Sequence, residues 1–107
     1  MFARITQFEI DTLRISLDDA LKRFQELILA DVRKQPGYEG VFVLQTAEGK
    51  GMLMSLWATE EDARTAVESG FYDEQVAKFV MFTKQAPGRN HYEVVFAEEV
   101  GEPAKAG

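Results

Sequence analysis

The side chains of this sequence best suited to chemistry on a small molecule are Trp57, Tyr72, His91 and Arg4. Trp57 offers an N–H donor and a flat wall, and Tyr72 can donate, accept or pass on a proton. His91 is the single histidine, and its ordinary pKa lies near neutrality. Arg4 could hold an anionic substrate. These residues are candidates for hydrogen-bond donation, proton transfer and anion binding.

Each candidate also has a structural interpretation. Trp57 could be a core residue at a strand end, and Tyr72 begins an apolar helix face. His91 follows a Gly-Arg-Asn loop, which is typical of an exposed histidine, and Arg4 could pair with an acidic neighbour across a sheet. The acidic run Glu60-Glu61-Asp62 is typical of charge at a helix N-terminus.

Composition excludes several classes of function. The net charge is −6, and Lys and Arg form no cluster of the kind that binds nucleic acid. The chain has no cysteine, so disulfides, thiolate metal sites and a cysteine nucleophile are excluded. With a single histidine and scattered carboxylates, we expect no metal site. The sequence indicates no signal peptide and no membrane span, so we expect a soluble cytoplasmic protein without a nucleic-acid or membrane partner.

The elements that must position these residues alternate in a recognisable order. The patterns predict strands at 2–10, 38–46, 51–58 and 91–98, and helices at about 16–34, 59–70 and 72–85. This order is the split βαβ arrangement of ferredoxin-like α+β folds, an antiparallel sheet with its helices on one face. Residues 1–98 should form one domain, and 99–107, rich in Gly, Pro and Ala, a flexible tail.

The predicted strands are apolar on both sides. Val41 and Val43 oppose Phe42 and Leu44, Leu53 and Trp57 oppose Met52, Met54 and Leu56, and Val95 and Ala97 oppose Val94 and Phe96. Helices can cover only one face, and the other would be an exposed apolar patch. We therefore expect a homodimer that stacks sheet on sheet about a two-fold axis.

Three sequence segments resemble the antibiotic biosynthesis monooxygenase (ABM) domain of the dimeric α+β barrel superfamily, over residues 1–98. They are Pro36-Gly37-Tyr38, Met54-Ser55-Leu56-Trp57 with Thr59-Glu60-Glu61-Asp62-Ala63, and Tyr92-Glu93-Val94-Val95. The resemblance implies a pocket between sheet and helices and a cofactor-independent oxidation of an aromatic or quinol-like molecule. Such chemistry needs oxyanion donors, a proton acceptor and a dry apolar cavity.

Under this resemblance the predicted site has two groups of residues. The catalytic residues are Trp57, Tyr72 and His91, and the substrate-binding residues are Arg4, Phe24, Ile28, Phe79 and Tyr92. No cofactor is expected. The haem-degrading branch of the superfamily fits poorly, because its helix histidine and first-strand asparagine have no counterparts in this sequence.

Two other functions remain open. The protein could be a non-catalytic dimer that binds a small apolar metabolite or has a stress-related role, or it could use the same barrel for isomerase or decarboxylase chemistry. An oxygenase should enclose a cavity for two or three fused rings. A purely structural dimer should fill that space with Phe24, Ile28, Phe79 and Phe82.

Overall fold

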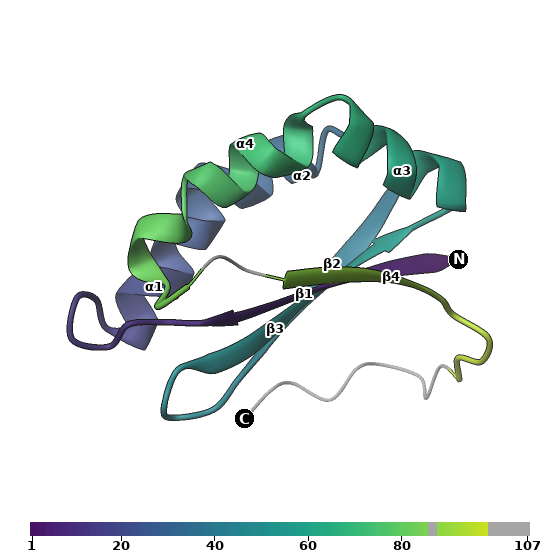
Figure 1. Cartoon of the computed structure of the whole chain (residues 1–107). Helices are drawn as coiled ribbons and strands as arrows, with labels where there is room; N and C mark the ends of the chain where they lie inside the picture. The colour runs from purple at the N-terminus through teal and green to yellow at the C-terminus, as the bar shows by residue number, and fades with distance from the viewer. Residues whose placement is uncertain (86–87, 99–107) are drawn as a thin grey trace.

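A computed structural model describes residues 1–85 and 88–98 as one four-stranded antiparallel sheet with its helices on one side (Figure 1). The elements are β1 (Phe2–Glu9), α1 (Leu17–Phe24), the π-helix η1 (Gln25–Leu29), α2 (Ala30–Val32), β2 (Tyr38–Gln45), β3 (Lys50–Trp57), α3 (Glu60–Glu68), α4 (Phe71–Ala77), the 3₁₀-helix η2 (Val80–Phe82) and β4 (Gly88–Glu93). The strand order is β2-β3-β1-β4. The predicted ferredoxin-like α+β fold is confirmed. No helix in the described part is long and apolar enough to cross a membrane.

The helices begin where the sequence indicates. The Ser16 hydroxyl accepts the Asp19 N–H at 3.1 Å, and the Thr59 hydroxyl accepts the Asp62 N–H at 3.0 Å. Each cap satisfies one of the N–H groups that a first helical turn leaves without a partner. The Thr59 cap starts α3 directly after β3. This short connection holds the helix against the end of the sheet.

The first helical segment has an unpredicted irregularity. Between α1 and α2 the chain widens into the π-helix η1, so the helical run from Leu17 to Val32 is not a regular α-helix. Phe24 and Ile28, before and within this segment, are both buried and face the sheet. Single π-helical turns are rare and occur often at functional sites.

Glycine is required at two positions where another side chain approaches the backbone closely. A Cβ at Gly51 would lie 2.3 Å from the ring of Phe8, which covers that position from β1. Gly37 has φ of 78°, and a Cβ there would lie 2.2 Å from a carboxylate oxygen of Asp62. Both contacts need a residue without a side chain, and Gly37 also occupies the left-handed region that favours glycine.

Two predicted elements are shorter than expected. The helix predicted over 72–85 ends at Ala77 as α4, because the chain then turns to form a bridge between Thr83 and Ile10 at the end of β1. The last strand runs over Gly88–Glu93 rather than 91–98. Its neighbour β1 begins at Phe2, so β4 has no residue to pair with beyond the bond from the Val94 N–H to the Met1 carbonyl. The predicted tail, 99–107, lies outside the described residues.

The two faces of the sheet have different environments. The helix-covered face carries Arg4, Thr6 and Phe8 of β1, with Val41, Val43, Leu53, Ser55 and Trp57 of β2 and β3. The helix-free face carries Phe42 and Leu44, which are 59% and 51% exposed. The predicted alternation of β2 and β3 is therefore confirmed, whereas Val94 to Ala97 lie beyond the end of β4 and do not alternate within the sheet.

Candidate functional site

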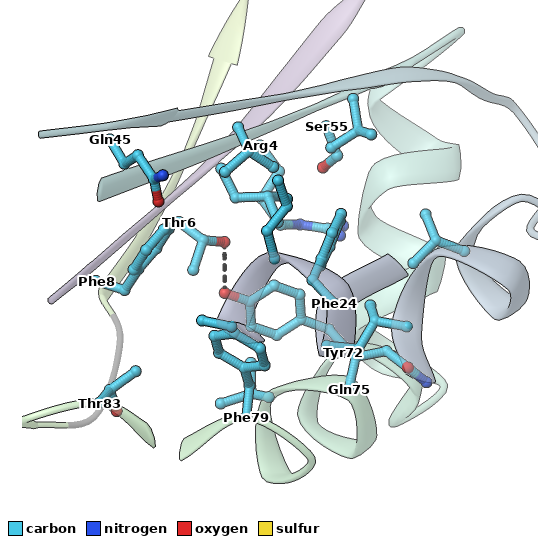
Figure 2. A pocket seen from close by; sticks show the side chains of 18 of the residues that line it. Arg4, Thr6, Phe8, Phe24, Gln45, Ser55, Tyr72, Gln75, Phe79 and Thr83 are labelled. Atoms are coloured by element: carbon cyan, nitrogen blue, oxygen red, sulfur yellow. Dashed lines mark hydrogen bonds between the residues drawn. The ribbon is translucent and has the colours of Figure 1, made fainter. Parts of the chain in front are cut away.

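An apolar cavity of about 120 Å³ lies between the sheet and the helices. Figure 2 shows Arg4 and Thr6 of β1 on one side, with Tyr72 and Phe79 on the other. Most of its walls are hydrocarbon, and the apolar side chains that line it include Ile10, Phe24, Ile28, Val41, Val43, Leu53, Trp57, Phe71, Val76 and Phe79. The cavity places a few polar atoms in a largely apolar space, which strengthens their electrostatic effect.

Arg4 is the charged residue of this cavity and is only 3% exposed. Its Nε–H donates to His91 Nε2 at 3.1 Å, and its Nη2 donates to the carbonyl oxygen of Ala63 in α3. Its guanidinium carbon lies 5.1 Å from the Trp57 ring centroid and 5.0 Å from that of Tyr72, which is cation–π distance.

Arg4 has no carboxylate partner in the part of the chain that the structure describes. None of the ion pairs among the described residues includes it. Burial lowers its pKa to about 10, so it remains a cation at neutral pH. The predicted alternative, in which Arg4 pairs with an acidic neighbour across the sheet, is wrong. Buried charges usually have a counterion, and within residues 1–85 and 88–98 this one contacts neutral acceptors and ring faces alone.

Tyr72 and Thr6 form a hydrogen bond across the cavity. Their oxygens are 2.7 Å apart, and either can be the donor (Figure 2). Thr6 lies two residues after Arg4 on the same face of β1, and Tyr72 lies in the first turn of α4. The Tyr72 ring lies within cation–π distance of two guanidinium groups, those of Arg4 at 5.0 Å and Arg89 at 4.9 Å. The hydroxyl pair can hold or pass on a proton beside a positive charge.

Trp57 is a wall of the cavity and is 1% exposed. Its indole N–H donates to the Ser55 hydroxyl at 3.0 Å. It also packs edge to face against Tyr38, with ring centroids 6.0 Å apart. Because Ser55 already takes the N–H, the face and edge of the ring are what Trp57 presents to the cavity.

His91 lies opposite Arg4 in the register of β1 and β4. Its Nε2 accepts the Arg4 N–H, so the proton of the neutral ring is on Nδ1. Partial burial lowers the pKa of His91 below 6.5, and the charges of Arg4 and Arg89 lower it further, against a smaller opposing effect of Glu60. His91 is therefore neutral at pH 7, and it holds Arg4 rather than lining the cavity itself.

The structure brings together six of the eight predicted site residues around the cavity, namely Arg4, Phe24, Ile28, Trp57, Tyr72 and Phe79. His91 contacts the site through Arg4. Tyr92 does not line the cavity, because it pairs with Ala3 on the helix-free face and is 51% exposed there. The catalytic and binding roles of these residues stay predictions.

The polar residues of the cavity that sequence reasoning missed include Thr6 and Ser55. Both are buried, at 8% and 4% exposure. Thr6 shares a strand face with Arg4, and Ser55 shares one with Trp57, so the period of two along each strand was a usable signal. Their partners, Tyr72 and the Trp57 indole, are what make them part of the site.

Within residues 1–85 and 88–98, no three His, Asp or Glu side chains lie together as a metal site would require. The polar groups of the cavity are hydroxyls, amides and a guanidinium, which are poor ligands for transition metals.

Comparison with known proteins supports the fold. No family model and no curated protein matches the sequence. A solved structure from Nitrosomonas europaea, provisionally named an antibiotic biosynthesis monooxygenase, has a TM-score of 0.68 at 17% identity and covers 90% of this chain and 100% of its own. SnoaB, a cofactor-independent oxygenase from Streptomyces nogalater, has a TM-score of 0.70 at 11% identity, covering 94% and 97%. A Nitrosomonas europaea protein of unknown function has a TM-score of 0.69 at 16% identity, covering 96% and 94%. The ABM-like fold predicted from the sequence is confirmed.

Proposed function

We propose that the protein is a homodimeric, cofactor-independent monooxygenase that oxidises an aromatic or quinol-like small molecule in the cavity between sheet and helices. The observation that carries this proposal is the buried guanidinium of Arg4, which has no carboxylate partner among the described residues and faces an apolar space. A bound molecule with negative charge supplies the missing counterion. The likeness to SnoaB supports the class of reaction.

The proposed oxidation requires only a few groups from the protein. A phenol loses a proton, its anion reduces O2, and the oxygenated ring loses water, so that phenol and O2 give quinone and water. Arg4 stabilises negative charge in the cavity, and the Tyr72–Thr6 pair takes the proton. The apolar walls exclude water from the reactive anion.

The proposed dimer rests on the helix-free face of the sheet. Phe42, Leu44 and Tyr92 are each at least half exposed there. Val95 and Phe96, just past the end of β4, are 84% and 80% exposed. Exposed apolar side chains of this kind mark an interface, and a second copy of the same face covers them by two-fold symmetry.

A non-catalytic role in binding a small apolar metabolite is the second candidate. The mostly hydrocarbon lining of the cavity favours it, because a binding module needs few convergent polar groups. The two candidates differ in what Tyr72 does, since only an enzyme needs a proton carrier beside the anion.

Oxygen consumption separates the two candidates. We expect chelator-treated protein to consume O2 in the presence of a panel of hydroquinones and hydroxylated aromatic acids, with a quinone product visible by absorbance and one atom of ¹⁸O2 incorporated per ring. The matched control is Tyr92→Phe, which removes a hydroxyl from the helix-free face and should leave turnover unchanged. Binding of these compounds without O2 uptake by any of them would favour the binding module.

A further inference from the structure

The guanidinium of Arg4 has more donors than the protein uses. Arg has five N–H groups, of which one on Nε goes to His91 and one on Nη2 goes to Ala63. In the described part of the chain, every inaccessible side-chain nitrogen or oxygen has a hydrogen-bond partner. Nη1 has no such partner, so it must be accessible. Both N–H groups of Nη1 and the second N–H of Nη2 therefore have no partner among the described residues.

This arrangement of donors fits a carboxylate. A planar fork with donors on two adjacent nitrogens matches the two oxygens of a carboxylate, which makes paired charge-assisted hydrogen bonds. His91 and Ala63 hold the fork from the sheet and from α3, so its orientation is fixed before a ligand arrives. A preorganised fork loses little conformational entropy on binding.

The rest of the cavity limits the size of the ligand. Its volume is about 120 Å³. An apolar protein cavity of about 150 Å³ binds benzene. The space between Val43 and Leu53 on the sheet and Phe24 and Phe79 on the helices is somewhat smaller than that cavity, so a ligand can place at most one aromatic ring in it. The expectation of two or three fused rings is not met by this volume.

We propose that the cavity binds a single-ring aromatic carboxylic acid, with its carboxylate on Arg4 and its ring among the apolar side chains. This deepens the proposed function, on which it rests for the location of the site. The substrate class becomes a hydroxylated monocyclic aromatic acid, and the Tyr72–Thr6 pair takes the proton of its ring hydroxyl.

Benzoate and benzamide test the proposal because they share a shape and differ in charge. By titration calorimetry at pH 7.5, we expect benzoate to bind at least about 10-fold more tightly than benzamide, which is the usual effect of a hydrogen bond to a charged group. We expect 2-naphthoate, with a second fused ring, to bind at least about 10-fold more weakly than benzoate.

Variants of Arg4 assign the effect to this residue. Arg4→Lys keeps the charge and loses the fork, so benzoate affinity should fall by about 10-fold. Arg4→Met should remove the preference for benzoate over benzamide. Retained benzamide binding shows that the variant cavity is folded. The matched control is Arg14→Lys, at an arginine whose side chain is 65% exposed, and it should change nothing.

Three results would overturn the proposal. They are equal affinity of the wild type for benzoate and benzamide, a preference for benzoate that survives in Arg4→Met, and binding of 2-naphthoate as tight as that of benzoate. Benzoate has no hydroxyl and undergoes no oxidation in this scheme, so its binding is independent of turnover. A protein that binds benzoate through Arg4 but oxidises neither the hydroquinones nor the hydroxylated acids would refute the proposed function and leave the binding of an aromatic carboxylate to Arg4 standing.

Discussion

Replacement of Phe42 by serine should weaken the proposed dimer strongly. Phe42 is on the helix-free face and is 59% exposed in the single chain. A phenylalanine presents roughly 200 Å² of surface, so about 120 Å² is open to a partner. At about 25 cal/mol per Å² this corresponds to about 3 kcal/mol per side chain, and a two-fold axis brings two copies together. Because a partner covers only part of this area and serine keeps some contact, we expect a loss of about 3 kcal/mol, or roughly 100-fold in the dimer Kd.

Sedimentation velocity over a range of protein concentrations measures this Kd. The wild type should be dimeric at micromolar concentration, and Phe42→Ser should dissociate in the same range. Leu13→Ser is the matched control, because Leu13 is 97% exposed in the loop between β1 and α1, away from the sheet face. A monomeric wild type, or a Phe42→Ser dimer with unchanged Kd, would refute the assignment of this face as the interface.

Three further predictions concern the cavity. Tyr72→Phe keeps the ring beside Arg4 but removes the hydroxyl bonded to Thr6, so the kcat of O2 consumption should fall roughly 100-fold; an unchanged kcat would remove Tyr72 from the mechanism. The pKa of His91 is lowered in the folded protein, so as the pH falls the His91 ring takes up a proton in the unfolded chain before it does so in the folded protein. The wild type therefore loses stability as pH falls below 6.5. His91→Gln lacks this loss, so its free energy of unfolding in urea should fall less between pH 7.5 and 5 than that of the wild type. Equal losses in the two proteins would contradict the role given to the Arg4–His91 pair. Burial lowers the pKa of Arg4 to about 10, so benzoate affinity measured by calorimetry should be constant from pH 7 to 9 and fall above pH 10 as the cation is lost. An affinity that stays constant above pH 10 would contradict the lowered pKa of Arg4.

Local signals in the sequence were sufficient for most of the fold. Ser16 and Thr59 cap helices because their hydroxyls accept from N–H groups three residues away, and such a contact depends on nearby residues alone. The faces of β2 and β3 followed from alternation within one hairpin, whose short turn fixes the register.

Contacts between distant segments were beyond sequence reasoning. Arg4 and His91 are 87 residues apart, and their hydrogen bond depends on the register between the first and last strands. The same register decides that Tyr92 points away from the cavity, since a shift of one residue exchanges the two faces of a strand. The π-helix at Gln25–Leu29 keeps the apolar spacing of an α-helix, so the sequence pattern does not distinguish it.

The most direct test of the central claim is to locate a bound ring by NMR. The claim is that the cavity between sheet and helices, with Arg4 at its wall, is the ligand site. With methyl-labelled protein and benzoate, we predict intermolecular NOEs from the ring protons to Val41, Val43 and Leu53, which line the cavity. NOEs to Leu44, Met52 and Met54 instead would place the ligand on the helix-free face and contradict the claim.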